Sequence, residues 1–242
     1  MKVLVISDIH GNLTALETVV EHAEAFDAVW CLGDVVGYGP DPNECVEYLQ
    51  TLPNLVCLLG NHDAAAIDKI DVSTFNKEAR ISISWMKRRM TKENLAVLQS
   101  LPSRLQIGDV TLAHASPRQP IVEYILDSYT ATENFQAFDT PYCFVGHTHL
   151  PVHYVIRHAS RFARPIVPEP NTAKELHVRS INNPGSVGQP RDRDNRASYV
   201  IYDIESKVWD YRRVEYDFIS VQRRMEAQDL PTRHIDRLAG GW

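Results

Sequence analysis

Two histidines, His147 and His149, are separated by one residue and follow an apolar run in the stretch FVGHTH. In an extended segment, residues i and i+2 point to the same side, so both imidazoles are expected to face one place. Imidazole nitrogens are common metal ligands. An isolated HxH pair is more often a surface or loop feature, so its interpretation depends on the rest of the chain.

Residues of related chemistry follow other short apolar runs. They are Asp8 and His10 in SDIHGN, Asp34 in GDVVGYGP, Asn61, His62 and Asp63 in GNHD, and His114 in AHASPR. Singly, each could be a helix cap, a turn residue or a satisfied core histidine. Five runs that all end in Asp, Asn or His, mostly beside glycines that permit sharp turns, instead predict one cluster. Carboxylates, imidazoles and an amide form the donor set of divalent metals, and such a set is costly to bury uncompensated. We therefore expect a pair of metals that share a bridging carboxylate.

The elements that position these residues follow from the hydrophobic pattern. The apolar runs 2–6, 28–32 and 55–59 are separated by segments with helical spacing, which predicts a parallel sheet covered by helices. Ligands bind beyond the carboxyl ends of such strands, where the cluster lies. Residues 75–101 are predicted to be helical, and strands are predicted at 110–115 and 142–147.

The pattern changes beyond residue 150. Runs rich in β-branched and aromatic residues, such as ASYVIYDIES and KVWDYRRVEY, predict an antiparallel sheet. We expect one domain with two sheets over residues 1–242. The proline-rich stretch 161–174 is predicted to be a surface excursion, and residues 229–242 a loosely held tail.

Composition excludes several classes of function. The 242 residues are 44% hydrophobic with a net charge of −6, so bulk binding to nucleic acid or an anionic membrane is not expected, nor is sequence-specific nucleic-acid binding. The chain shows neither a signal-peptide pattern nor an apolar run of membrane-spanning length, which predicts a cytoplasmic protein. Its four cysteines lack CxxC spacing and are expected to be reduced thiols.

Taken in order, the blocks DxH, GDxx, GNH(D/E), a later His and GHxH resemble the signature of the calcineurin-like metallophosphoesterase superfamily. The resemblance implies an α/β fold, a four-layer αββα sandwich of two mixed β-sheets flanked by helices. It also implies that one metal is held by Asp8, His10, Asp34 and His149, and the other by Asp34, Asn61, His114 and His147. His62 is the implied catalytic residue, as a hydrogen-bond or proton donor to the substrate.

Further blocks are similar to the bacterial and archaeal small-phosphodiesterase branch: NPGSV after residue 182, GDVVGYGPDPNE and HASPR. The turn NPGSVGQPR suits an anion, although it reads equally well as a structural turn. Arg118 and Arg191 are therefore candidates for binding phosphate, and Tyr38 is expected to overhang the site. The protein-phosphatase members carry GDxVDRG, in which the second Asp orients the catalytic His. Gly37 and Tyr38 replace that Asp and the Arg here, and Asp63 is not expected to substitute for the missing partner.

The function implied is hydrolysis of a phosphate ester through in-line attack by a metal-bridging hydroxide. A small phosphodiester or a nucleotide, such as a dinucleoside polyphosphate, is the expected substrate. A protein or small-molecule phosphomonoesterase is the alternative, and a metal-free interaction scaffold is an alternative of another class. Manganese is the expected metal, with Fe, Zn, Co or Ni as alternatives. The sequence does not predict an oligomeric state.

The remaining histidines lack motif partners. His153 follows the GHTH block and is a candidate to support a metal ligand, whereas the others are predicted to lie on the surface: His22, His158, His177 and His234.

Overall fold

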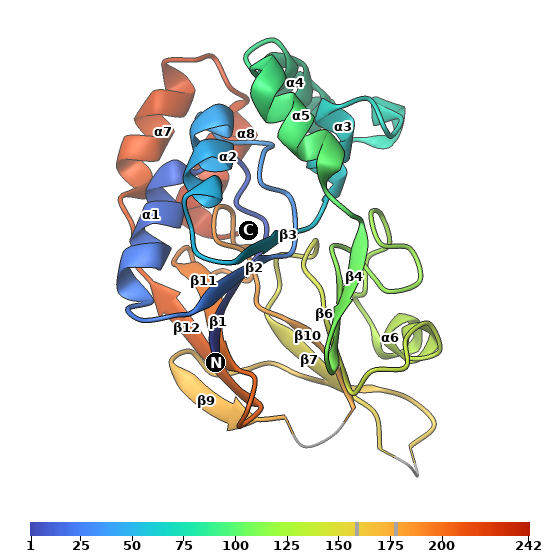
Figure 1. Cartoon of the computed structure of the whole chain (residues 1–242). Coiled ribbons are helices and arrows are strands. Elements are labelled where there is room, and N and C mark those ends of the chain that lie inside the picture. Colours follow the sequence, from blue (N-terminus) through green and yellow to red (C-terminus); the bar gives the residue numbers. More distant parts are fainter. Residues whose placement is uncertain (158–159, 177–178) are drawn as a thin grey trace.

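The computed structural model describes residues 1–157, 160–176 and 179–242, and its described strands form two six-stranded sheets (Figure 1). In spatial order, the first sheet consists of β3 (Leu55–Cys57), β2 (Ala28–Cys31), β1 (Lys2–Ile6), β11 (Ala197–Asp203), β12 (Val208–Val214) and β9 (Thr172–Glu175). The second consists of β4 (Arg104–Ile107), β5 (Val110–Ala113), β6 (Tyr142–Phe144), β10 (Ser180–Asn183), β7 (Val152–Val155) and β8 (Arg164–Ile166).

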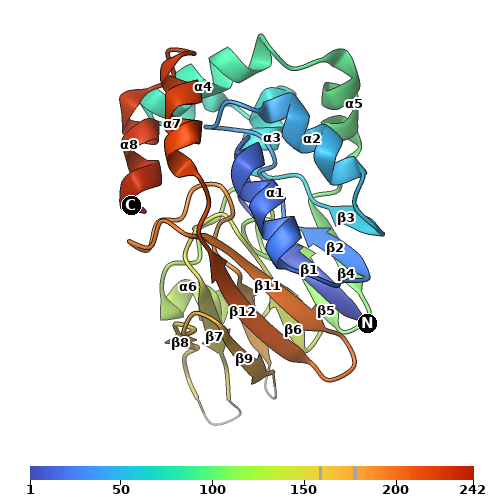
Figure 2. The same cartoon turned by 90° about the vertical axis from the view of Figure 1, so that its left-hand side faces the viewer.

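The helices lie outside the two sheets or above their ends (Figure 2). They are α1 (Leu13–His22), α2 (Pro42–Gln50), α3 (Asn61–Ala66), the 3₁₀ turn η1 (Val72–Thr74), α4 (Lys77–Lys87), α5 (Lys92–Ser100), α6 (Ser128–Asn134), α7 (Phe218–Glu226) and α8 (Thr232–Gly240). No helix in the described ranges is long and apolar enough to cross a membrane.

Side-chain alternation along the strands builds the layers. Val3 and Val5 of β1 face the other sheet, where they join a core that contains Phe144 of β6. Leu4 and Ile6 point the other way and pack with the helices on the outer face. Both faces of the strand are buried because helices cover one and the second sheet covers the other. Helix α6 covers the outer face of the second sheet. The predicted αββα sandwich is thereby confirmed.

Both sheets are mixed. Strands β1, β2 and β3 are parallel, as their helical connections predict, and the antiparallel β11 and β12 extend the same sheet. In the second sheet β5, β6 and β10 are parallel. The parallel strands direct their carboxyl ends toward one region of the molecule, beneath α3 and the loops around it.

Two expectations about local structure need correction, and one needs detail. The stretch 161–174 lies at the surface as expected, but it contains β8 and the start of β9; Pro165 is tolerated in β8 because β8 is an edge strand. Residues 229–242 are not a loose tail, since α8 buries His234, Ile235 and Leu238. The helical stretch 75–101 is two helices, α4 and α5, separated at residues 88–91.

Candidate metal centre

The seven predicted metal ligands meet at the carboxyl ends of the parallel strands. Each is at most 7% exposed. Asp8, Asp34 and Asn61 follow β1, β2 and β3 of the first sheet, whereas the three histidines of AHASPR and GHTH follow β5 and β6 of the second. The centre therefore lies where the two sheets come together, and neither sheet alone could build it.

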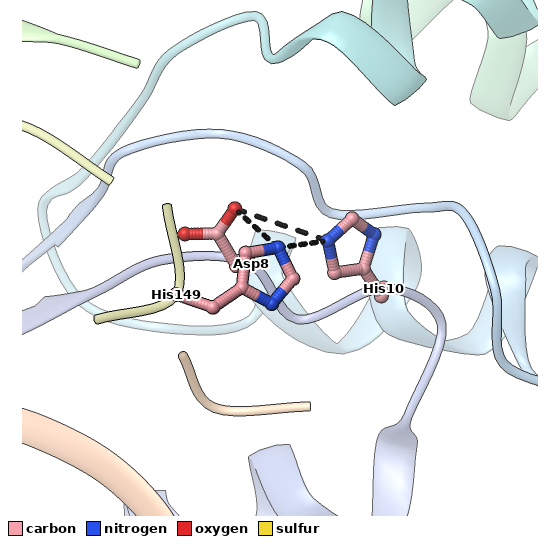
Figure 3. Close-up of side chains that lie close together, drawn as sticks. All are labelled: Asp8, His10 and His149. Atoms are coloured by element: carbon pink, nitrogen blue, oxygen red, sulfur yellow. Dashed lines mark hydrogen bonds and ion pairs between the residues drawn. The ribbon is translucent and has the colours of Figure 1, made fainter. Parts of the chain in front are cut away.

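Asp8, His10 and His149 form the first group, called the covered cluster below (Figure 3). The two histidines face each other with their Nε2 atoms 3.0 Å apart, and Asp8 Oδ1 lies 3.4 Å from His149 Nε2 and 3.8 Å from His10 Nε2. His149 Nδ1 donates to the Gln189 carbonyl at 2.6 Å, so its Nε2 carries the lone pair in the neutral ring. The lone pair and the carboxylate oxygen converge on one point.

Asp34, His114 and His147 form the second group, the open cluster. His114 Nε2 lies 3.4 Å from Asp34 Oδ2 and 3.2 Å from both His147 Nδ1 and the Asn61 amide oxygen. His114 Nδ1 donates to the Leu32 carbonyl at 3.0 Å, which again directs Nε2 to the other ligands. Asn61 thus adds a fourth donor to this group.

Asp34 lies between the two clusters. Its Oδ2 is 3.4 Å from His114 Nε2 and 3.6 Å from His10 Nε2. Its Oδ1 accepts a hydrogen bond from the His62 backbone N–H at 2.8 Å, which fixes the carboxylate. Among the described residues it is the carboxylate placed to serve both groups.

Backbone strain is concentrated at these residues. Five of the seven have left-handed backbone conformations: Asp8 (φ 55°), His10 (φ 51°), Asp34 (φ 54°), His147 (φ 64°) and His149 (φ 60°). Such conformations are uncommon outside glycine and cluster at functional sites. They also correct the expectation of an extended HxH segment facing one place, because His147 joins the open cluster and His149 the covered one.

Burial shifts the pKa values of several ligand residues toward their neutral forms. Burial raises the pKa of Asp8 to about 7 and lowers the pKa of both His10 and His149 well below the usual range. Asp8 Oδ1, which faces His10 and His149, is buried and finds no hydrogen-bond partner among the described residues. Neutral imidazoles and carboxylates around such an atom are the donors that divalent transition metals take, so the residues fit a dinuclear metal site.

His62 is held by Tyr38. Its Nε2 lies 2.9 Å from the Tyr38 hydroxyl, and burial lowers the pKa of His62 to about 4. Asp63 does not substitute for the missing partner, because its carboxylate accepts from the backbone N–H groups of Val36 and Gly60. A Cβ at Gly37, where φ is 154°, would overlap the His10 imidazole, so this backbone excludes the Asp of related enzymes.

The NPGSV block supports the ligands from behind, which the sequence did not reveal. Ser186 Oγ donates to the Asp8 carbonyl at 2.8 Å, and Asn183 Nδ2 donates to the Gly146 carbonyl at 2.7 Å, one residue before His147. The signal that could have found them is the NPGSV block itself, a Gly/Pro turn at the end of β10. Their hydrogen bonds fix the loops that carry the ligands.

The two candidate arginines lie in different places. Arg191 stands 5.7 Å from the Tyr38 ring centre and lends positive charge to the centre. Arg118 is paired with Glu123 and Glu133 at the surface and has no described contact with either cluster.

The other histidines are also resolved in part. His153 is buried against Trp209 and bonds Asn182 Oδ1 at 2.7 Å, with no described contact to a cluster. His22 is exposed as expected, whereas His234 is 1% exposed and packs on Tyr38, which corrects its surface assignment. His158 and His177 lie outside the described residues.

Comparison with known proteins agrees with this arrangement. Residues 1–207 match the calcineurin-like phosphoesterase superfamily domain. The chain is 37% identical to an uncharacterized protein of Methanocaldococcus jannaschii, over 98% of this chain and 96% of that protein. A metallophosphoesterase from Sphaerobacter thermophilus has 44% identity and a TM-score of 0.92, over 100% of this chain and 99% of that one.

A shorter match links the chain to a symmetrical bis(5'-nucleosyl)-tetraphosphatase of Pseudomonas syringae. It has 40% identity over 67 residues, which is 26% of this chain and 23% of that protein. The full-length similarities and the buried clusters lead to one conclusion: the chain belongs to the calcineurin-like phosphoesterase superfamily, a family of metal-dependent phosphoesterases.

Proposed function

We propose that the protein hydrolyses small phosphodiesters or nucleotides with two divalent metal ions, of which Mn²⁺ is the expected one. The position of Asp34 carries this proposal, because one carboxylate oxygen within 3.6 Å of ligand atoms from both clusters can hold two cations close together. Asp8, His10 and His149 would complete one shell, and the remaining ligands, Asn61, His114 and His147, the other. When bound, the cations supply Lewis acidity to the phosphoryl group and acidify a water molecule.

The chain's own residues position the substrate. His62 has a lowered pKa of about 4, so its ring is neutral at pH 7 and acts as a hydrogen-bond donor to a phosphoryl or leaving-group oxygen. The Tyr38 hydroxyl fixes the orientation of that ring. Arg191 adds long-range positive charge that favours an anionic substrate. We give Arg118 no direct contact with the phosphate, since its guanidinium is paired with Glu123.

The departure at Gly37 and Tyr38 supports a diester. A phosphomonoester dianion gains from a guanidinium beside the metals, which gives bidentate recognition. A diester carries one negative charge and a second substituent, so losing that arginine costs it less. The partial likeness to a dinucleoside tetraphosphatase is consistent with a nucleotide substrate, although it covers only 26% of the chain.

The test compares kcat/KM for bis(4-nitrophenyl) phosphate and 4-nitrophenyl phosphate at saturating Mn²⁺ and neutral pH, because that ratio compares transition-state stabilisation. We expect the diester to be preferred. A large preference for the monoester would replace this assignment with a phosphatase.

The scaffold alternative makes a different forecast. It is disfavoured because all seven ligand positions are filled by donor residues, and metal analysis of purified protein together with turnover of either ester decides between the two. A cytoplasmic location is part of the proposal and is supported by four unpaired cysteines.

A further inference from the structure

A cavity of about 570 Å³ opens beside the open cluster. Asn61, His62 and His147 line it, so it reaches the proposed metal ligands directly. Its volume lies within the range of about 300–1,000 Å³ that is usual for small-ligand sites. Tyr38 lines this cavity and also a second space, which it shares with His10 and which measures about 10 Å³. Of the two, only the larger can hold a group esterified to a phosphate at the clusters.

Beside Tyr38, two further aromatic side chains form walls of this cavity. Tyr124 stacks on the His147 imidazole, with ring centres 3.8 Å apart and an angle of 27° between the planes. Phe75 meets the His62 ring edge-on at 5.3 Å. Tyr124 is still 48% exposed, so much of its ring remains available to a ligand in the cavity. An ordered aromatic ring with a free surface binds planar groups by stacking.

The other walls disfavour an anionic occupant. They are formed by apolar and polar side chains: Ile70, Ala79, Val122, Asp71, Thr74 and Asn76. No Lys or Arg is among the described residues that line the cavity. The Asp71 carboxylate would repel a second phosphate, whereas a neutral group pays no such cost.

The segment that carries Tyr124 is fixed from behind. The neighbouring Glu123 carboxylate accepts from Ser116 Oγ at 2.6 Å and from Asn134 Nδ2 at 2.9 Å, and it pairs with Arg118. A wall that is held in place before the ligand arrives loses less entropy on binding. Arg118 therefore contributes to this cavity through Glu123.

We infer that the cavity is a subsite for a planar, uncharged aromatic substituent of the phosphate ester, stacked on Tyr124 with Phe75 as the second wall. A nucleobase and a simple aryl group share this chemistry. The inference rests on the proposed function, because the phosphoryl group must lie at the two clusters. It also places no second phosphate in this cavity.

Non-hydrolysable phosphonates test the subsite by binding alone. Isothermal titration calorimetry on the Mn²⁺-loaded protein would compare phenylphosphonate, cyclohexylphosphonate and methylphosphonate. We expect phenylphosphonate to bind roughly tenfold more tightly than methylphosphonate and clearly more tightly than the non-planar cyclohexyl compound, as stacking requires. Tyr124→Ala should remove the preference for phenyl over cyclohexyl, and Tyr124→Phe should keep it. Tyr129→Ala is the matched control, because Tyr129 lies nearby in sequence, is 66% exposed and does not line the cavity.

The outcomes separate the subsite from the proposed function. Equal binding of phenyl and cyclohexyl compounds, or a phenyl preference that survives in Tyr124→Ala, would overturn the subsite while ester hydrolysis persists. If inorganic phosphate fails to bind the Mn²⁺-loaded protein and no ester is turned over, both proposals fall. A phosphonate analogue of a nucleoside 5'-phosphate identifies the source: tighter binding than phenylphosphonate, lost in Tyr124→Ala, assigns the subsite to a nucleobase, and weaker binding assigns it to a smaller aryl group.

Discussion

The covered and open clusters are built from the same residue types, yet their surroundings differ. Tyr38 lines a space on the side of the covered cluster and another on the side of the open cluster. The first, against His10 and the C-terminal helices, measures about 10 Å³, which is scarcely enough for one water molecule. The second measures about 570 Å³ and reaches His147. The covered cluster therefore has almost no free space on this side, whereas the open cluster adjoins a cavity large enough for a small ligand.

The clusters also differ in charge without metal. In the covered cluster, burial raises the pKa of Asp8 to about 7, and the two imidazoles beside it are neutral. Without metal, this cluster can therefore be uncharged. In the open cluster, burial opposes the charged form of His114, but the Asp34 carboxylate outweighs it and raises the pKa of His114 to about 9. A buried ion pair thus takes the place of a cation in the open cluster. Similar sets of ligands therefore lie in different electrostatic surroundings.

The largest effect should come from Asp34, which joins the two clusters. Asp34→Asn keeps an oxygen for the His62 N–H but weakens the shared carboxylate. We expect kcat/KM to fall by more than roughly 100-fold. Mutation of a residue that only hydrogen-bonds a metal ligand already lowers metal affinity or activity by typically 10–100-fold. Metal analysis should show less bound metal, and circular dichroism an intact fold. Full activity in metal-replete Asp34→Ala would contradict the two-metal centre.

The charge difference predicts a pH effect on the metal-free protein. The folded pKa of His114 is about 9, above its usual value near 6.5, so its stabilising contribution is complete below pH 6.5 and is lost as the pH rises through 9. This loss amounts to at most roughly 3 kcal/mol. Thermal melts of metal-free protein should therefore show Tm falling between pH 7 and 9. His114→Gln should flatten that slope, and an unchanged slope in this variant would remove the ion pair as its cause.

A variant of His62, beside the open cluster, tests whether this residue acts as a hydrogen-bond donor or as a proton donor. Because its ring is neutral at pH 7, we expect His62→Ala to reduce kcat by roughly 100-fold, as loss of one oxyanion donor does. The loss should be similar for diesters with good and poor leaving groups. This differs from a proton donor, whose removal would penalise the poor leaving groups far more. A steep leaving-group dependence of the loss would restore that role.

The sequence predicted the ligands better than it predicted their conformations. Asp8 and Asp34 were found because strand ends in parallel sheets gather at one edge, which is a consequence of chain direction alone. The left-handed backbone of His147 and His149 could not be read in this way, because non-glycine residues rarely adopt it and the surrounding contacts impose it. The motif and the family resemblance therefore gave the ligand types and their division between two groups, but not the backbone conformations that place them.

Contacts between segments far apart in sequence could not be predicted either. Residues 232–240 gave no motif, yet His234 packs on Tyr38, which lies almost 200 positions earlier. A nearer pairing was missed as well: Arg118 is a candidate phosphate ligand in HASPR, and the structure shows that Glu123, five residues later, pairs with its guanidinium. Pairings of this kind depend on packing, which a local pattern does not encode.

A smaller effect is expected from the helix that seals the covered side. The His234 ring lies 4.3 Å from the Tyr38 ring, so His234→Ala leaves Tyr38 less constrained and His62 less well oriented. We expect a fall of roughly 3- to 10-fold in kcat with unchanged metal content, since small misplacements of catalytic groups are costly. Asp236→Ala, at an exposed position of the same helix, is the control. Equal effects of the two variants would show that the loss reflects general destabilisation of α8.

The smallest effect is expected from the four thiols, of which Cys31, Cys45 and Cys143 are buried. Cys31 and Cys57 are register partners on the parallel strands β2 and β3, whose ends carry Asp34 and Asn61. Burial raises the pKa of Cys45 and of Cys143, so these thiols remain protonated and unreactive at neutral pH. A thiol reagent should therefore react slowly with the native protein and leave its activity unchanged. After unfolding without reductant, the same reagent should titrate four thiols. A count of two thiols in place of four would reveal a disulfide, and Cys31 and Cys57 are the neighbouring pair that could form it. Reduction of that disulfide should then alter the open cluster before the covered one.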